Sequence, residues 1–197
     1  MSKFAVIDTE TNWNNEVMSI GVVIDDDERF DKSPANNAVI PLDRKYYIIT
    51  PECEVGGMYG YALNNVPKEF TIKCSREQVI KDLLYWLNCN QIKAVFAYNA
   101  SFDCRCLPEL NMFEWYDIMR LAAYKQFNHK IADELACCST GRLQRGYGVE
   151  PILKMLMDNE YFTKTYSESH NALLDAQDEL KIMYLLGYKV KDYIKLN

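Results

Sequence analysis

Two carboxylates follow the first apolar run of the chain, in the sequence FAVIDTET. The run Phe4 to Ile7 predicts a strand, and Asp8 and Glu10 come directly after it. Because alternate side chains of a strand share a face, the two acids point the same way. Like charges about 4 Å apart repel by about 4 kcal/mol at an effective dielectric of about 20. The pair therefore predicts a divalent cation that prefers oxygen ligands, Mg²⁺ or Mn²⁺, while a solvated loop start is the alternative.

A third acid, Asp103, lies in the sequence AYNASFD, four residues after Asn99. A predicted strand ends there and a short helix begins, and open α/β sheets bind ligands at such strand ends. The alternative is that Asn99 or Ser101 caps the helix. Asp103 would then complement the positive helix end, which is worth about 0.5–1 kcal/mol.

The last cluster, HNALLDA, contains His170, one of two histidines in the chain, and Asp175. The predicted helix around Asp175 is otherwise apolar, and a carboxylate near a core face is costly unless it is paired or binds a metal. His170 lies at the positive end of that helix. The positive partial charge at this helix end lowers the pKa of the imidazole and favours the neutral form that a general base needs. An ordinary surface histidine is the alternative.

The elements that must position these clusters alternate along the chain. Strands are predicted over 4–7, 17–24, 46–50, 94–98 and 112–118. Helices are predicted over 76–89, 102–107, 119–127, 151–157 and 171–186. The order predicts an α/β fold, a mixed five-stranded sheet flanked by helices on both faces.

Local signals set several of these boundaries. Ser75 and Gln78 form a capping-box pattern. Pro151 is predicted as the first residue of its helix, Ser169 as a helix cap and Gly187 as a helix end. Two connections complete the outline: 25–37 is polar and predicts an exposed hairpin connection, and 52–61 contains three glycines and predicts a mobile loop.

The bulk composition predicts one soluble domain over residues 1–197, with 49% hydrophobic and 25% charged residues. No apolar run is long enough for a signal peptide or a membrane span, so we expect a cytoplasmic protein. The seven cysteines lack zinc-site spacing and are expected to be reduced thiols. The net charge of −6 argues against tight non-specific binding of nucleic acid, but not against an enzyme that holds only a strand end.

Taken together, the three clusters match three motifs in order. The first motif, D-x-E after an apolar strand, corresponds to Asp8 and Glu10. The second, N-x-x-F-D at a later strand end, corresponds to Asn99, Phe102 and Asp103. The third, H-x-A-L-x-D-A, corresponds to His170, Ala172, Leu173, Asp175 and Ala176. The chain therefore resembles the DEDD exonuclease superfamily, in its histidine-containing (DEDDh) branch, which includes the proofreading epsilon subunit, RNase T and oligoribonuclease.

The resemblance implies a ribonuclease H-like fold and a 3′–5′ exonuclease that releases nucleoside 5′-monophosphates from single-stranded DNA or RNA. Two divalent cations, Mg²⁺ or Mn²⁺, would stabilise the attacking and leaving oxygens. By the same resemblance Asp8 would bridge both ions, Glu10 and Asp175 would hold the ion that delivers water, and Asp103 would support the second. His170 would take the proton from the attacking water, a role typically worth about 10²–10⁴-fold.

Substrate contacts are predicted within and beside the motifs. The candidate residues are Thr9, Thr11, Trp13, Asn99 and Phe102. Trp13 and Phe102 would stack on bases at about 1–3 kcal/mol each, with core packing as the alternative for Phe102. Many relatives have Thr-Gly after the first motif, whereas this chain has 12–15 in the sequence NWNN. Basic residues that would contact phosphates, or else are simply solvated, are Lys125, Lys130, Arg142 and Arg145.

Three questions stay open at this stage. The motifs serve DNA and RNA alike, so an oligoribonuclease or another RNA-trimming enzyme is the nearest alternative. A nucleic-acid-binding module that has lost catalysis is the alternative from a different class. Association with a polymerase is possible by the resemblance, but only VKDYIKLN follows the last predicted helix, so we expect a free-standing enzyme. Homodimers occur in the family, and no feature of the sequence decides whether this chain forms one.

Overall fold

The computed structural model describes residues 2–32 and 41–196, and for 31 and 32 it describes the backbone only. Part of the predicted connection 25–37 lies outside these residues. In the described part, β2 (Val17–Asp26) continues to Asp26 and the short helix α1 (Asp27–Lys32) follows. The predicted hairpin is confirmed, because β2 pairs antiparallel with the next strand, β3 (Asp43–Ile49). Its connection is corrected over 25–32, where a strand end and a short helix replace the exposed loop.

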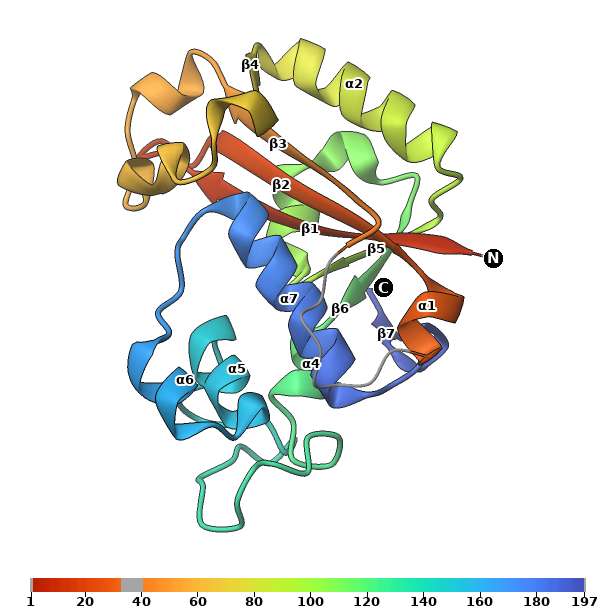
Figure 1. Ribbon diagram of the computed structural model, residues 1–197, viewed down its shortest axis with the longest axis vertical. Helices are drawn as coiled ribbons and strands as arrows, with labels where there is room; N and C mark the ends of the chain where they lie inside the picture. Colours follow the sequence, from red (N-terminus) through yellow and green to blue (C-terminus); the bar gives the residue numbers. More distant parts are fainter. Residues whose placement is uncertain (1, 33–40, 197) are drawn as a thin grey trace.

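The described residues form a seven-stranded mixed sheet in the order β4-β3-β2-β1-β5-β6-β7 (Figure 1). Its other strands are β1 (Lys3–Thr11), β3 (Asp43–Ile49), β4 (Thr71–Cys74), β5 (Ala94–Ala97), β6 (Glu114–Asp117) and β7 (Ile194–Lys195). The pairs β1–β2, β2–β3 and β6–β7 are antiparallel, whereas β1–β5, β3–β4 and β5–β6 are parallel. The predicted α/β mixed sheet is confirmed. The predicted number of five strands is wrong, because β4 has no buried residue that would mark it as an apolar run and β7 has only two residues.

Helices cover both faces of this sheet, as predicted. The helix α2 (Arg76–Cys89) lies on one face and α7 (Ala172–Leu186) crosses the other (Figure 1). The shorter helices are α3 (Ser101–Cys106), α4 (Met119–Ala122), α5 (Val149–Met157) and α6 (Glu160–Thr165). Single 3₁₀ turns occupy Glu52–Glu54, Gly60–Asn64, Lys68–Phe70, Pro108–Leu110 and Val190–Asp192.

Strand β1 divides its side chains between two buried cores. Phe4 and Val6 pack in the core under α7, whereas Ala5 and Ile7 pack in the core under α2. Because side chains alternate along a strand, Asp8 and Glu10 continue the row that faces α7. The alternation predicted from the sequence therefore directs both acids toward the helix that carries the third motif.

A glycine lets α7 approach the sheet at this point. Gly21 of β2 is paired with Asp8 of β1. A Cβ atom at Gly21 would lie 2.1 Å from the carbonyl carbon and oxygen of Ala172, the first residue of α7. Only a residue without a side chain permits this contact. Gly21 thus sets the start of α7 directly beside the strand position that carries Asp8.

Several predicted boundaries are confirmed and others are corrected. Helix α2 has the predicted limits and a capping box between Ser75 and Gln78, and α7 ends at Gly187 in the left-handed conformation. The helix α5 begins at Val149, so Pro151 is its third residue instead of its first. The cap of α7 is Asn171, not Ser169, because the Asn171 side chain accepts hydrogen bonds from the first backbone N–H groups of the helix.

The helix predicted over 119–127 is wrong beyond Ala122. Asn128 donates a side-chain hydrogen bond of 2.7 Å to the carbonyl oxygen of Ala122, and Tyr124 forms a bridge with Arg142. These contacts turn the chain back after one helical turn. The loop predicted over 52–61 is also corrected, since its ends form two 3₁₀ turns. All seven cysteines are free thiols.

Candidate active site

The two acids of the first motif project from the middle and the end of β1. Asp8 is paired with Gly21 and Glu10 with Ser19 of the neighbouring strand. The Oδ2 atom of Asp8 is shielded from solvent and has no hydrogen-bond partner. A buried carboxylate oxygen without a donor is rare in folded proteins, because it loses its hydration without replacement. This oxygen is therefore suited to an ion or a ligand.

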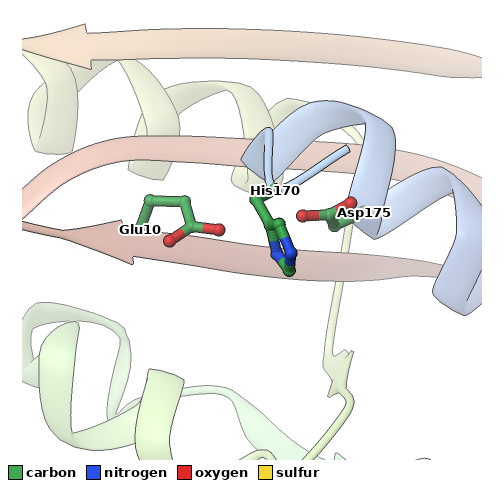
Figure 2. A group of neighbouring side chains, drawn as sticks. All are labelled: Glu10, His170 and Asp175. Carbon is green, nitrogen blue, oxygen red and sulfur yellow. The ribbon is translucent and has the colours of Figure 1, made fainter. Parts of the chain in front are cut away.

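Glu10, His170 and Asp175 come together at the start of α7. One ligand atom from each lies within 4.8 Å of the others, a distance that a single metal ion spans. Figure 2 shows the carboxylates of Glu10 and Asp175 pointing toward the imidazole of His170, which lies between them. Within residues 2–32 and 41–196, no other histidine, cysteine or acid residues form such a group.

Asp103 reaches the same region from α3. It lies in the first turn of that helix, is 2% exposed, and accepts a hydrogen bond of 2.7 Å from the hydroxyl of Thr9. Its negative charge acts on Asp8 and on Glu10. Asp103 thus belongs to the same electrostatic cluster, although its carboxylate is outside the close group around His170.

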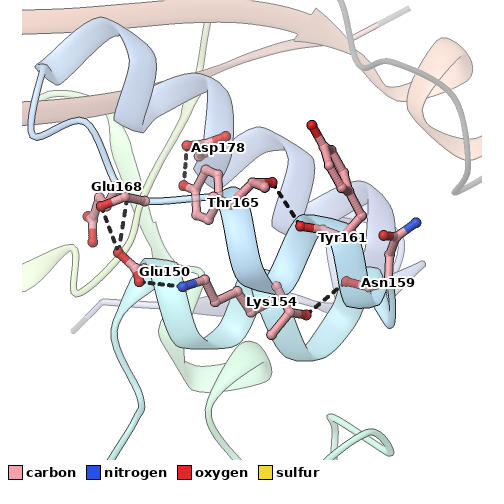
Figure 3. Close-up of polar contacts among 10 residues, drawn as sticks. Glu150, Lys154, Asn159, Tyr161, Thr165, Glu168 and Asp178 are labelled. Atoms are coloured by element: carbon pink, nitrogen blue, oxygen red, sulfur yellow. Dashed lines mark hydrogen bonds and ion pairs between the residues drawn. The ribbon is translucent and has the colours of Figure 1, made fainter.

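Residues 166–170, which precede α7 and contain His170, are fixed by polar contacts with α5 and α7. The Tyr166 hydroxyl donates to Asp178 of α7, and the backbone N–H of Glu168 donates to Glu150 of α5 at 3.0 Å (Figure 3). His170 itself has a left-handed φ of 52°. Such a backbone conformation costs free energy in a residue other than glycine and persists where the surroundings enforce it. The turn before α7 is therefore held in one conformation by its neighbours.

Burial and mutual repulsion raise the pKa of every acid in this cluster. Burial, followed by the charges of Glu179, Asp103, Asp175 and Glu10, holds the pKa of Asp8 well above its usual range. Burial raises the pKa of Glu10 to about 8, of Asp175 to about 8 and of Asp103 to about 7. None of the ion pairs between described side chains involves these acids. A site with so many unpaired carboxylates is suited to cations.

A fifth buried carboxylate, Glu179, was not predicted from the sequence. It is 1% exposed, lies one turn after Asp175 on α7, and accepts a hydrogen bond of 3.1 Å from the backbone N–H of Tyr98. Burial and the charges of Asp103 and Asp175 hold its pKa well above its usual range. The sequence carried a signal for it, because 179 falls on the apolar stripe of the helix with Ala176.

His170 has a pKa lower than that of an ordinary histidine, and the main cause is burial, while the charge of Glu150 acts in the opposite direction. The predicted preference for a neutral imidazole agrees with this shift. Burial alone gives the shift this direction, and the predicted effect of the positive end of the last helix stays a prediction. A neutral imidazole beside Glu10 and Asp175 has a lone pair available to accept a proton.

The five candidate substrate residues differ in their surroundings. Thr9 is buried and its hydroxyl donates a hydrogen bond to Asp103, so its side chain positions the Asp103 carboxylate instead of facing a substrate. Trp13 is 65% exposed and Phe102 is 37% exposed. Thr11 and Phe102 line one surface pocket of about 510 Å³. Asn99 is exposed, has a φ of 60°, and turns the chain from β5 into α3.

The predicted phosphate-binding residues are mostly engaged with other groups. Lys125 is paired with Asp133 and Lys130 with Asp158, each at 2.8 Å. The guanidinium of Arg142 lies over the ring of Tyr147, 4.9 Å from its centroid. Arg145 is exposed. A phosphate that bound either lysine would have to displace an acid, so Arg142 and Arg145 are the better placed of the four.

Comparison with protein-family models gives no match for this chain, and comparison with curated proteins gives none either. Among the helices of the described residues, none is long and apolar enough to cross a lipid bilayer.

Proposed function

We propose that this chain is a metal-dependent 3′–5′ exonuclease of the DEDDh type with a ribonuclease H-like fold. It would hydrolyse phosphodiester bonds at the 3′ end of single-stranded DNA or RNA and release nucleoside 5′-monophosphates. The observation that supports this most is the clustering of Asp8, Glu10, Asp103 and Asp175 beside the imidazole of His170. The mixed sheet with helices on both faces is compatible with this fold class.

The clustered acids would hold two divalent cations, of which one is supported by the group of Glu10, His170 and Asp175, whose ligand atoms lie within 4.8 Å of one another. The unpartnered, solvent-shielded Oδ2 of Asp8 and the raised pKa values of the surrounding acids support this proposal, because bound cations would partner the Asp8 oxygen and relieve the repulsion between the carboxylates. Asp8 would be shared by both ions, Glu10 and Asp175 would hold one, and Asp103 would support the other. Bound Mg²⁺ or Mn²⁺ would stabilise negative charge on the attacking and leaving oxygens.

The chain's own residues would supply the remaining functions. His170, neutral and next to Glu10 and Asp175, would accept the proton of the attacking water at an imidazole nitrogen. Thr9 would keep Asp103 in place through its hydrogen bond. Exposed Trp13 and Phe102 would stack against bases of the substrate strand. Together these residues would orient a strand end whose scissile phosphate lies over the carboxylates.

The proposal is tested with purified protein, Mn²⁺ and 5′-labelled single strands of matched DNA and RNA sequence, each short and long. A ladder of products shortened from the 3′ end is expected, and EDTA should abolish it. An Asp8→Ala variant from the same preparation controls for a contaminating nuclease. Degradation of RNA alone would assign the activity to the RNA-trimming alternative.

Intact substrate under every metal condition would overturn the proposal. If the same protein nevertheless retarded the strands in a gel-shift assay, the chain would be a binding module without catalysis.

A further inference from the structure

The imidazole of His170 is covered by an aromatic ring from a distant part of the chain. The ring centroids of Tyr59 and His170 are 3.8 Å apart and their planes differ by 15°, which is a face-to-face stack. Tyr59 lies between two 3₁₀ turns in 52–64, here called the Tyr59 segment. No motif of the sequence pointed to this segment. Its ring nevertheless makes the closest aromatic contact of the candidate general base.

The Tyr59 segment is fastened to the end of β1 at several points. Asn12 donates a side-chain hydrogen bond of 3.1 Å to the carbonyl oxygen of Glu52. The backbone N–H of Trp13 donates to the carbonyl oxygen of Gly56 at 3.0 Å. A Cβ atom at Gly57 would lie 2.6 Å from the carbonyl oxygen of Thr11, so only glycine allows this approach.

The far end of the segment is bound to the start of α7. The side chain of Asn171, which caps α7, also donates to the carbonyl oxygen of Ala62 at 2.8 Å. Asn171 directly follows His170, so one residue joins the cap of α7, the histidine and the Tyr59 segment. The position of Tyr59 relative to His170 is thus determined from both ends of the segment.

The His170 ring has few other constraints on its orientation. Between the side chains that the structure describes, no hydrogen bond to the imidazole is formed. Figure 2 shows the imidazole of His170 between the carboxylates of Glu10 and Asp175. A catalytic base must be held within a narrow range of positions, and a misplacement of about 1 Å can cost about 10²-fold in rate. Among the described residues, the stack with Tyr59 is the one aromatic contact that the His170 ring makes.

We propose that Tyr59 is a positioning residue that holds the imidazole of His170 in the orientation required for proton transfer, and that the Tyr59 segment forms a wall of the active site. This inference rests on the proposed nuclease function for its catalytic consequence, but not for the contact itself. The aromatic face of Tyr59 is the part that matters, because the stack involves the ring and not the hydroxyl.

The kinetic test compares Tyr59→Ala and Tyr59→Phe with the unchanged protein. Tyr59→Ala should lower kcat by about 10- to 100-fold with little change in KM, and Tyr59→Phe should restore kcat because it keeps the ring. Tyr61→Ala is the matched control, since Tyr61 belongs to the same segment and is 70% exposed. If Tyr59→Ala kept full kcat while the unchanged protein was active, the inference would be overturned and the proposed function would stand.

A double variant tests whether Tyr59 acts through His170. His170→Ala alone should lower kcat by about 10²–10⁴-fold. In that background, Tyr59→Ala should cause no further loss, because the side chain it positions is gone. A full additional loss of kcat would show that Tyr59 acts on something else and would overturn the inference.

A spectroscopic measurement tests the contact without any activity. The chain has two histidines, so its imidazole proton signals in an NMR spectrum can be assigned with one variant, His129→Gln. His129 is exposed, whereas the ring current of Tyr59 should move the His170 signals upfield. Tyr59→Ala should remove this shift and Tyr59→Phe should keep it. Identical His170 signals in all three proteins would overturn the inference even if no nuclease activity were found.

Discussion

Asp25 and Asp8 lie on adjacent central strands, and their carboxylates have opposite surroundings. Asp25, near the end of β2, accepts hydrogen bonds from the Tyr184 hydroxyl at 2.6 Å and the backbone N–H of Asp26 at 3.0 Å, and Arg29 lies 3.7 Å away. Asp8 has a buried oxygen with no donor at all. The Asp25 carboxylate is satisfied by partners within the fold, whereas the Asp8 carboxylate has an oxygen left to bind an ion or a ligand.

The pKa values reflect this difference. Burial raises the pKa of Asp25, but the Tyr184 hydrogen bond, the Asp26 backbone and the charge of Arg29 all lower it. At Asp8, burial and every neighbouring charge raise the pKa. A protein gains no stability by collecting acids in this way, and the cluster therefore supports the proposed functional site. The comparison teaches that the partners of a buried acid, and not its burial, separate the two roles.

The largest expected effect separates these two acids directly. Asp8→Asn should lower the hydrolysis rate by about 10³-fold or more, because it removes a charge needed at the reacting phosphate. Its stability should be unchanged or higher, since a repelled charge is lost. Asp25→Asn should instead lose about 1–3 kcal/mol of unfolding free energy and keep its rate. Urea denaturation and single-turnover kinetics measure the two quantities.

The opposite pattern would break the comparison. If folded Asp25→Asn protein lost its activity while Asp8→Asn protein kept it, the functional carboxylate would be on β2 and not on β1.

Substitution of Glu179 should have an effect of intermediate size. Its carboxylate has one backbone donor, so it is less satisfied than that of Asp25 and more satisfied than that of Asp8. Glu179→Gln keeps an acceptor for the Tyr98 N–H but removes the negative charge. We expect Mn²⁺ affinity to fall by about 10–100-fold, as is typical for residues that support a metal site. Calorimetric titration of the folded variant with Mn²⁺ checks this. Unchanged affinity would place Glu179 with Asp25 among the acids of purely structural importance.

The smallest effect is the pH dependence of stability. Burial and neighbouring charges raise the pKa of Glu10 from 4.5 to about 8 and that of Asp175 from 3.8 to about 8. The folded state therefore binds more protons than the unfolded state in this range, and stability must fall as the pH rises. Above 6.5, the ordinary pKa of histidine, His170 is neutral in both states and does not oppose the trend.

The thermal midpoint in EDTA should accordingly decrease between about pH 6.5 and about pH 8, and Glu10→Gln should reduce the slope. Excess Mn²⁺ should raise the midpoint most at the higher pH, because the ion binds ionised carboxylates. A midpoint in EDTA that rises with pH would show that the acids of the site are not repelling one another.

The sequence alone determined the features that depend on residues close together along the chain. Strand alternation was enough to predict that Asp8 and Glu10 share a face, because that follows from backbone geometry. The limits of α2 and the end of α7 at Gly187 follow from local capping hydrogen bonds and a left-handed glycine. These signals do not require knowledge of the rest of the chain.

Tertiary structure decided everything that depends on segments far apart in the sequence. Tyr59 covers His170 only because glycines and Asn171 bring its segment against β1 and α7. Glu179 joins the site only because Gly21 lets α7 approach the sheet. Such contacts come from close packing, which selects among many arrangements that the local sequence permits equally.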